Sequence, residues 1–396
     1  MKRIVLLGIL CSMAAYSRCQ PLVYFDFLSH DEDTGPWNNT SYYTGDRTKL
    51  IALATYFQSK GITLNLQSDW LYLTNVISKE TPTLMAGTGN KNILRWLHED
   101  KGVELDPHSH EKIYIYPDIV NLMDSLGLPE SKLMGGSLYN KMNGINVWTN
   151  LINGQNGVIF PNKFWQPDYI MGGGSPNHVA DLNYYGFWNP KDTANYLTHW
   201  PANHLRHLGV GCDIKVFDTS SVAVIAAKLR DVIQKVQSGQ YPASGFYVQT
   251  IFFGHGDLNN TAFYNKLLQV ADSANAIVAS GKAQWKTLKQ AYTEWETTYA
   301  AQMFQWECGQ LSTGLEEDAT NAIRMYPNPA SDMITVEAKD NISGTSYMVS
   351  DLAGRQILTG ALDNQNSYVD LRGLEAGLYF IRIGSNTGEV FKVIKK

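Results

Sequence analysis

The hydrophobic residues of this chain follow one pattern up to about residue 305 and another pattern after it. In the first part, short apolar runs typical of buried strands alternate with segments whose apolar residues recur every three or four positions, which is typical of helices. This β–α alternation predicts an α/β fold, with a parallel sheet or barrel covered by helices. The predicted strands are residues 21–29, 62–67, 103–108, 168–174, 211–218 and 245–253, and the predicted helices are 45–61, 90–102, 116–127, 221–239, 261–281 and 284–300.

The pattern changes near residue 310. The segment GQLSTGLEEDATN is polar and lacks periodicity, which favours a linker, and short β-rich runs separated by Gly, Asn and Asp follow it. These runs predict a small antiparallel sandwich without helices. This part contains no His and no Cys, so we expect no catalytic role for it. The predicted organisation is a leader at 1–19, an α/β domain at 20–308, a linker at 309–323 and an all-β domain at 324–396.

The first residues predict a secretory signal peptide. Lys2 and Arg3 precede a short apolar run, and Ser17 and Cys19 provide small residues before a cut at Gln20. No later segment approaches the length of a membrane-spanning helix, so we expect an exported chain without one. Three of the 32 Lys and Arg residues lie in the leader and none of the 37 acids does, which leaves a formal charge of −8. This charge argues against non-specific nucleic-acid binding.

Three motifs in the last domain occur in a characteristic order. They are MYPNPASDMITVE at 325–337, VSDLAGRQIL at 349–358 and LRGLEAGLYFIRI at 371–383, before the basic ending KVIKK. With these motifs the domain resembles the type IX secretion sorting domain of Bacteroidetes. The resemblance implies export through the periplasm and then through the type IX machinery of the outer membrane, so that the protein is secreted or held at the cell surface.

Cysteines and aromatic residues add two open questions. Cys212 and Cys308 remain after removal of the leader, and they form either one disulfide or two buried thiols. Many aromatic residues lie beside Asn, Gly and Pro, as in GPWNNTSYY and LNYYGFWNP. This composition is typical of sugar-binding clefts, where flat rings stack on sugars and amides meet hydroxyl groups. The alternative is ordinary packing of long loops.

Ionisable residues follow three of the predicted strands, where parallel α/β folds place their functional groups. His30, Asp31, Glu32 and Asp33 follow the first strand. Strand alternation places His30 and Glu32 on one side and Asp31 and Asp33 on the other. Either the four residues form a solvated turn, or some of them hold a cation.

The stretch GVELDPHSHEKIYIYPDI carries His108 and His110, which project to one face if the strand continues through residue 110. Two imidazoles suit zinc and similar ions, and a carboxylate would complete a three-ligand open site. The alternative is a pair of surface or core histidines. In YVQTIFFGHGDL, His255 follows a buried strand and could transfer a proton near neutral pH, or it could be a turn histidine bonded to Asp257.

The order and spacing of these three groups resemble the polysaccharide deacetylase family, a distorted (β/α)7 barrel, over roughly residues 21–300. The resemblance implies Asp31 as catalytic base and Glu32 as metal ligand, with Asp33 as competitor for these roles. The family's His-Ser/Thr-x-x-His motif is matched by His108, while its second histidine falls on Lys112, so His110 is the substitute.

The last family motif, Leu-x-His, is matched by FFGHG, which makes His255 the general acid. Two motifs fit poorly. The nearest candidate for the Arg-Pro-Pro element is WQPDYIMGGGS, which has no arginine, and YYGFWNPKD matches Asp-x-x-Asp-Trp only loosely.

The resemblance therefore implies a secreted metal-dependent hydrolase that removes acyl groups from a glycan. Glu32, His108 and His110 would hold a divalent ion, with zinc expected and cobalt, manganese or nickel as alternatives. Asp31 would accept a proton from water, and His255 would protonate the leaving amine or alcohol. Two other hypotheses stay open: a carbohydrate-binding protein without turnover on the same barrel, and a glycoside hydrolase that uses two carboxylates such as Asp31 and Asp181.

Overall fold

The structure is a computed structural model, in which the chain divides into two compact units, Met1–Leu311 and Ser312–Lys396. Most of the predicted leader and linker lies outside the described residues. The described ranges are 22–31, 35–109, 113–135, 147–171, 183–217, 219–309, 323–326, 328–338, 343–351, 354–363, 366–384 and 389–396.

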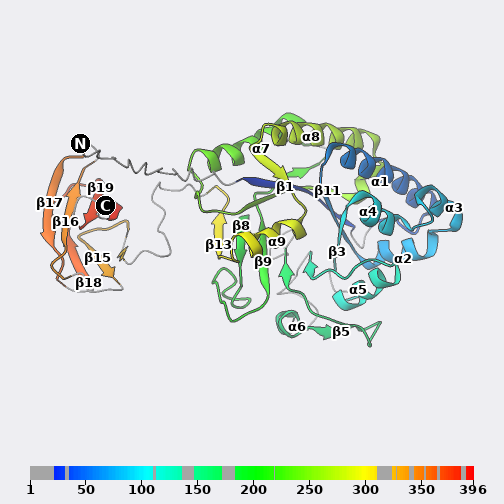
Figure 1. The fold of residues 1–396 in the computed structure, drawn as a ribbon, viewed down its shortest axis with the longest axis horizontal. Helices are drawn as coiled ribbons and strands as arrows, with labels where there is room; N and C mark the ends of the chain where they lie inside the picture. The colour runs from blue at the N-terminus through cyan, green and yellow to red at the C-terminus, as the bar shows by residue number, and fades with distance from the viewer. Residues whose placement is uncertain are drawn as a thin grey trace, which may run out of the picture. The chain divides into compact units, whose positions relative to one another are not determined.

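A parallel sheet forms the centre of the first unit (Figure 1). Its strands lie in the order β10–β11–β1–β2–β3, and β12 pairs with the amino-terminal part of β1. Every pair in this sheet is parallel, so the predicted α/β class is confirmed. The strands are β1 (Val23–Asp31), β2 (Leu64–Ser68), β3 (Glu104–Pro107), β10 (Lys215–Val216), β11 (Tyr247–Gly254) and β12 (Ala283–Trp285).

Helices cover one face of this sheet (Figure 1). Val23, Phe25 and Phe27 of β1 pack there with apolar residues of α1, α4, α7 and α8. Burial of these side chains is the main favourable contribution to folding of this layer. The helical segments are α1 (Thr40–Lys60), α2 (Trp70–Lys79), α3 (Pro82–Met85), η1 (Ala86–Thr88), α4 (Ile93–Lys101), α5 (Tyr116–Ser125), α6 (Val147–Asn153), α7 (Val222–Gln237), η3 (His255–Asn259), α8 (Thr261–Ala279) and α9 (Leu288–Thr298).

Helix α1 begins earlier than the sequence pattern predicts. Asn39 caps it by accepting a hydrogen bond from the backbone N–H of Tyr42 at 3.1 Å, and Gly61 ends it in a left-handed conformation with φ 68°. Asp46 therefore lies inside the helix and is buried, and does not stabilise its first turn. Helices α2 and α3 were not anticipated from the sequence.

The inner face of the parallel sheet packs against a second sheet with the order β13–β8–β9–β7–β4. Tyr24 and Leu28 of β1 share an apolar cluster with Tyr169, Phe187 and Leu208 of that sheet. Strands β8 and β13, which the sequence pattern did not predict, run antiparallel to their neighbours. The strands are β4 (Leu133–Met134), β7 (Tyr169–Ile170), β8 (Tyr184–Trp188), β9 (Arg206–Val210) and β13 (Phe304–Glu307), with a separate pair β5 (Gln155–Asn156) and β6 (Phe164–Trp165).

A parallel bridge between His108 and Gly135 joins the two sheets. The backbone N–H of Gly135 donates to the carbonyl of Pro107 at 3.1 Å. A Cβ atom on Gly135 would overlap the side-chain amide of Gln67, so this approach requires glycine. A closed barrel is not found among the described residues, and the (β/α)7 barrel stays a prediction.

Cys212 and Cys308 form a disulfide, with Cα atoms 5.5 Å apart. The bond ties the segment after β9 to the segment after β13, across a sequence separation of 96 residues. Closing a loop of this length restricts the unfolded chain, and in the loop-entropy picture it stabilises the fold by about 5 kcal/mol. Of the two alternatives left by the sequence, the structure therefore contains the disulfide.

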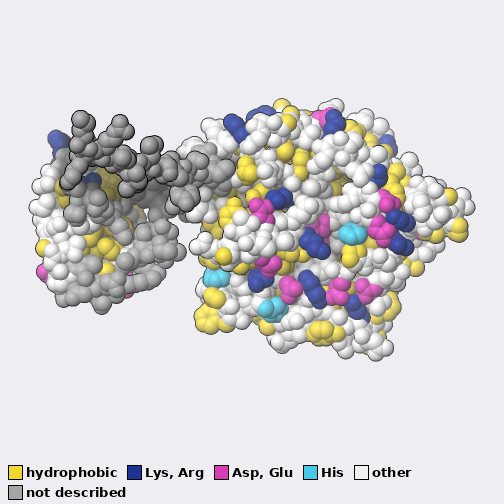
Figure 2. Space-filling model, in the orientation of Figure 1, with side chains coloured by type: hydrophobic (Ala, Val, Ile, Leu, Met, Phe, Trp, Pro, Cys, Tyr) yellow, Lys and Arg dark blue, Asp and Glu magenta, His cyan; other side chains and the backbone are white. Residues whose placement is uncertain are grey.

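The surface of the first unit carries mixed charges on the face drawn in Figure 2. Lys and Arg side chains lie beside Asp and Glu side chains across that face. Ion pairs at the surface of this unit include Arg95 with Glu99 and Lys132 with Glu130. Opposite charges this close largely cancel each other's field at a distance.

The second unit is a sandwich of two antiparallel sheets. Their orders are β14–β15–β18 and β17–β16–β19–β20. Ile334 and Val336 of one sheet share a core with Val349, Ile381 and Val393 of the other, and the predicted all-β C-terminal fold is confirmed. The strands are β14 (Ile323–Tyr326), β15 (Met333–Ala338), β16 (Ser346–Ser350), β17 (Gln356–Ala361), β18 (Asn366–Asp370), β19 (Gly377–Ile383) and β20 (Glu389–Lys395).

Candidate functional site

Four parallel strands end at one edge of the first sheet, and polar side chains stand at each of these ends. The register pairs His30 with Gly254, Asp31 with Ser68, and Ser68 with Pro107. The carboxyl ends of β1, β2, β3 and β11 therefore lie side by side. In α/β folds this is the edge at which ligands bind.

On the helix side of this edge, four buried residues form what we call the acid–histidine cluster: Asp31, Asp46, Ser68 and His255. Asp31 contacts Nδ1 of His255 through Oδ1 and accepts a hydrogen bond from Ser68 Oγ through Oδ2 at 2.8 Å. On the other side of the ring, Nε2 of His255 lies 2.8 Å from Oδ2 of Asp46, which helix α1 provides. One imidazole is thus held between two carboxyl groups.

Aromatic rings enclose the cluster. The centroids of the Trp37 and Tyr72 rings lie 5.0 Å and 4.9 Å from that of His255, and both aromatic side chains are buried. The backbone N–H of Asp69 donates to the carbonyl of Asp31 at 3.2 Å, which fixes the start of α2 against the end of β1. These contacts shield the cluster from water, and electrostatic interactions inside it are stronger as a result.

Burial sets the protonation of the cluster. It raises the pKa of Asp46 well above the ordinary 3.8 and lowers the pKa of His255 to about 3. The raised pKa of Asp46 and the lowered pKa of His255 both favour a protonated Asp46 that donates to Nε2 of a neutral His255. The remaining proton of the ring is then on Nδ1, the atom that contacts Asp31.

On the inner side of the same edge, His30 and His108 form a second group, the histidine pair. Their ring centroids lie 4.4 Å apart and both side chains are buried. The backbone N–H of His108 donates to the carbonyl of Ser68 at 3.0 Å, which holds this residue at the end of β3. His30 and Asp31 leave β1 on opposite sides, as alternation predicts.

Below the histidine pair, the same face of the sheet carries three buried acids, Asp26, Glu104 and Asp106. Burial raises the pKa of all three carboxyl groups. Glu104 accepts hydrogen bonds from the backbone N–H of Lys289 at 3.0 and 2.9 Å, and Asn65 donates to Asp106 at 2.5 Å. The interior beneath the candidate site is therefore polar and structured.

Of the five predicted site residues, the structure describes Asp31, His108 and His255, and all three lie at this edge. Glu32 and His110 lie outside the described residues, as do the competitor Asp33 and the alternative acid Asp181. Strand β3 ends at Pro107, so the strand does not continue to residue 110 as the same-face argument required. The roles assigned to these residues stay predictions.

Asp46 and Ser68 were not anticipated as members of the site. The signal for Asp46 was available, because it recurs with Tyr43, Leu50 and Leu53 on the buried face of α1. An acid on the apolar stripe of a helix needs a buried partner. The sequence could not say which partner, since His255 lies 209 positions away.

The donor types at this edge fit a first-row metal ion only in part. Among the described residues, no group of three His, Cys, Asp or Glu side chains is arranged to hold a metal. The imidazoles of His30 and His108 are the ligand type that zinc favours. A complete ligand set would need the carboxylate of Glu32 or the ring of His110 beside them.

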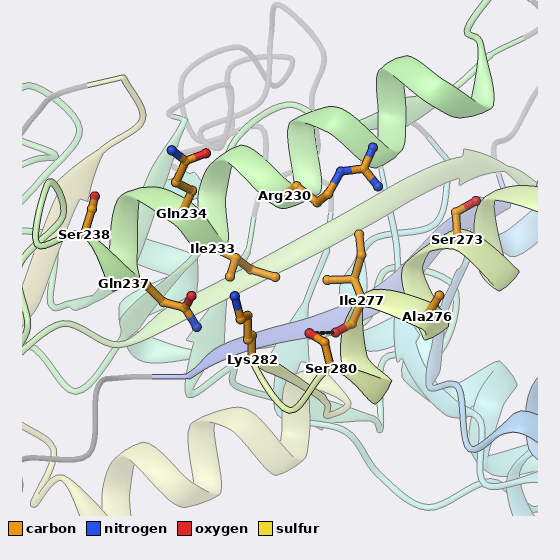
Figure 3. A pocket seen from close by; sticks show the side chains of 10 residues that line it. All are labelled: Arg230, Ile233, Gln234, Gln237, Ser238, Ser273, Ala276, Ile277, Ser280 and Lys282. Carbon is orange, nitrogen blue, oxygen red and sulfur yellow. Dashed lines mark hydrogen bonds between the residues drawn. The ribbon is translucent and has the colours of Figure 1, made fainter.

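A hollow of about 830 Å³ lies elsewhere in the unit, between α7 and α8 (Figure 3). Gln237 and Ser238 at the end of α7, and Ser280 and Lys282 after α8, are among the residues that line it. These helix ends lead into the amino ends of β11 and β12. The hollow is therefore at the opposite end of the sheet from the acid–histidine cluster.

Comparison with known proteins identifies the second unit. Residues 324–396 match the family of the secretion system C-terminal sorting domain. The chain thus carries a type IX sorting domain at its C-terminus, which implies the type IX secretion machinery as a partner and a secreted or cell-surface location. No helix among the described residues is long and apolar enough to cross a membrane.

A search of curated proteins found no match for the chain. A structure of PorZ, titled as a surface component of the type-IX secretion system of Porphyromonas gingivalis, shares 18% identity over 23% of this chain and 13% of its own, with a TM-score of 0.17. The 4-alpha-glucanotransferase from Thermococcus litoralis shares 10% identity over 69% of this chain and 38% of its own, with a TM-score of 0.39. An engineered protein shares 11% identity over 94% and 93%, with a TM-score of 0.26.

Proposed function

We propose that the first unit is a secreted metal-dependent hydrolase that removes acyl groups from a glycan. The observation that supports this proposal is the contact of Asp31 with His255, beside the histidine pair, where four parallel strands end. Perturbed acids and histidines gathered at a strand edge are typical of hydrolytic sites.

In this proposal the chain's own residues prepare a proton acceptor. Ser68 Oγ donates a hydrogen bond to Oδ2 of Asp31, and Nδ1 of His255 contacts Oδ1 of the same carboxyl group. Asp46 fixes the tautomer of His255 from the far side of the ring. A divalent ion held by Glu32, His108 and His110 would, when bound, polarise a water molecule and the acyl oxygen.

The general-acid role of His255 makes a further demand on the structure. Its side chain is fully buried and both ring nitrogens face carboxyl groups. A proton from Nδ1 can therefore reach a leaving group only through Asp31, or after substrate binding displaces one of these contacts.

The test combines metal content with product release. The full chain would be loaded with Zn²⁺, Co²⁺, Mn²⁺ or Ni²⁺, and acetate would be measured after incubation with acetylated xylan and acetylated chitin oligomers. We expect stoichiometric metal and acetate release, and we expect the His108→Ala variant to lose both. His204→Ala is the control, because His204 precedes β9 and lies near the carbonyl of Pro167, at 3.2 Å. Full metal retention in His108→Ala would refute the assignment.

One observation favours a second candidate, a carbohydrate-binding protein without turnover. Asp31, Asp46 and His255 are all buried, so no acid of the cluster faces solvent directly. Glycan binding by a metal-free chain, with no acetate released, would select this alternative.

A further inference from the structure

Beside the strand edge, three half-buried aromatic side chains form what we call the aromatic platform: Trp70, Tyr114 and Phe160. Trp70 begins α2 directly after β2, and Tyr114 lies between β3 and α5. The rings of Trp70 and Tyr114 are stacked, with centroids 5.2 Å apart and planes at 12°. Phe160 extends the platform, with its centroid 6.4 Å from that of Tyr114.

The platform is continuous with the candidate site along the chain and through hydrogen bonds. Trp70 follows Ser68 by two positions, and Ser68 donates to Asp31 in the acid–histidine cluster. On the other strand, Ser109 follows His108 and its hydroxyl donates to the carbonyl of Tyr114 at 2.8 Å. The platform and the strand edge are therefore adjacent along two segments of the chain.

A buried carboxylate holds the outer part of the platform in place. Asp118 of α5 accepts hydrogen bonds from the backbone N–H groups of Val158, Ile159 and Phe160, at 3.1, 3.0 and 2.9 Å. A Cβ atom at Gly157 would overlap this carboxylate, so the turn requires glycine. The loop is thus fixed by charge-assisted hydrogen bonds rather than by burial of its own side chains.

The fixed loop exposes apolar side chains that folding alone does not require. Val158 is 66% exposed and Ile159 is 45% exposed, and Phe164 in the neighbouring strand β6 is 55% exposed. Clustered apolar groups on a rigid surface mark a binding site. Half-buried aromatic rings suit a ligand with flat C–H faces.

We propose that the aromatic platform binds an oligosaccharide, of which one pyranose ring stacks on the face of Trp70 or of Tyr114 that the other ring does not cover. This inference rests on the proposed function for the identity of the reacting group but not for the binding itself. It assigns to the platform the recognition of the sugar chain and to the strand edge the chemistry.

The test measures binding without turnover. The full chain would be titrated by calorimetry with hexamers of N-acetylglucosamine, xylose, β-linked glucose and α-linked glucose. We expect at least one hexamer to bind and Trp70→Ala and Tyr114→Ala each to weaken it by about tenfold, the lower end of the loss found when a nucleobase loses its aromatic stacking partner. Trp70→Phe should stay within about threefold of the unchanged chain, because it keeps a flat ring. Trp200→Ala is the matched control, since this 47% exposed tryptophan precedes β9 at the other end of the sheet.

The outcomes separate this inference from the proposed function. Binding that is lost in the ring variants, without any acetate release, would support the platform as a binding site and contradict the proposed hydrolase activity. Acetate release with unchanged KM in both alanine variants would contradict the platform as a binding site and support the proposed hydrolase activity. Failure of all four hexamers to bind, or equal binding by Trp70→Ala in a chain whose circular dichroism is unchanged, would overturn the inference. Binding of a hydrophobic dye in place of any sugar would do the same and would indicate a protein partner.

Discussion

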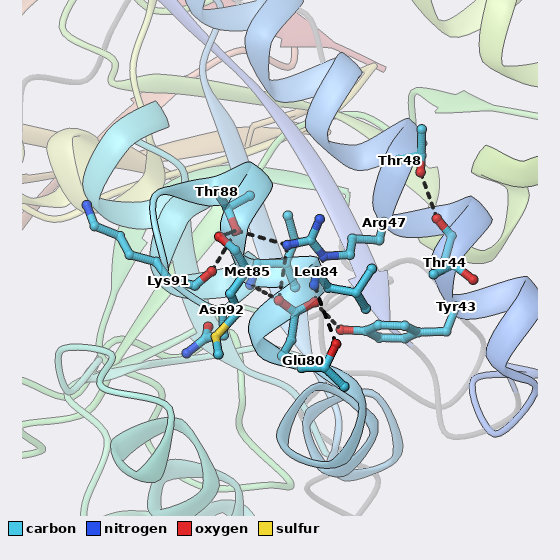
Figure 4. Close-up of polar contacts among 12 residues, drawn as sticks. Tyr43, Thr44, Arg47, Thr48, Glu80, Leu84, Met85, Thr88, Lys91 and Asn92 are labelled. Carbon is cyan, nitrogen blue, oxygen red and sulfur yellow. Dashed lines mark hydrogen bonds and ion pairs between the residues drawn. The ribbon is translucent and has the colours of Figure 1, made fainter.

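Asp46 and Arg47 are neighbours on α1, yet they enter two buried polar clusters of opposite character. Arg47 belongs to a complete ion-pair network (Figure 4). Its Nε and one terminal nitrogen donate to the two oxygens of Glu80 at 2.6 and 3.1 Å, and it also donates to Thr88 at 2.9 Å. Tyr43 donates to Glu80 at 2.8 Å, so both charges have hydrogen-bonding partners.

Asp46 enters a cluster that is not balanced in this way. Its partner His255 faces a second carboxyl group, that of Asp31, and no Lys or Arg among the described residues contacts the three. A balanced buried pair contributes to one defined packing of α1 against its neighbours. An unbalanced set of acids around a histidine has perturbed proton affinities, which is useful in a site that moves protons. The comparison shows that burial alone does not tell whether a charged side chain stabilises the fold or serves a functional site, because the presence of a counter-ion also matters.

The largest expected effect comes from breaking the balanced network. Glu80→Ala leaves Arg47 buried without a counter-ion, which costs about 3–5 kcal/mol of the free energy of unfolding. Urea denaturation followed by circular dichroism measures this loss. The control is Glu99→Ala, because Glu99 pairs with Arg95 on the surface of α4, where solvent screens the pair and its loss should change stability little. Equal losses in the two variants would contradict the structural role of the network.

The next effect should appear in activity rather than in stability. Asp31→Asn keeps the shape of the side chain but removes the proton acceptor, so kcat for acetate release should fall by about 100-fold or more. Its midpoint in urea should shift little, since Ser68 and His255 can still hydrogen-bond to an amide. At a temperature where Glu80→Ala remains folded, that variant should keep its kcat. A loss of kcat in Glu80→Ala with none in Asp31→Asn would reverse the comparison.

The smallest effect concerns the pH dependence of stability. The pKa of Asp46 is raised above 3.8 in the folded chain, so the unfolded chain loses this proton first and stability falls as the pH rises above about 4. Asp46→Asn lacks this titration. Relative to the unchanged chain, its free energy of unfolding should therefore improve as the pH rises from 4 to 7.

His255 provides the control for the sign of this effect. Its pKa is lowered to about 3, so its contribution is complete above pH 6.5 and is lost as the pH falls toward 3. Asp46→Asn should keep this acid-side fall. A difference between the two proteins that does not change with pH, measured by urea denaturation at pH 4, 5.5 and 7, would show that Asp46 is ionised in the folded chain.

Hydrophobic patterns along the sequence were sufficient to predict single helices and strands, because the residues that form such an element are neighbours in the sequence. Strand β11 and helix α8 lie where the apolar runs and the helical periodicity predict them. The same patterns were insufficient to predict the pairing in the second sheet, where β8 and β13 pair antiparallel across more than a hundred residues. Short strands of two to five residues have too few positions to show their direction or their partners.

The sequence by itself determined the sorting domain, the α/β class and the strand ends at which Asp31, His108 and His255 stand, because these follow from ordered motifs and from the periodicity of single elements. Only the tertiary structure decided that Cys212 meets Cys308, that Asp46 faces His255 and that Trp70 stacks on Tyr114. Each of these contacts joins segments whose approach depends on the packing of the whole unit. Burial, which sets the pKa of Asp46 and of His255, likewise exists only once that packing has formed.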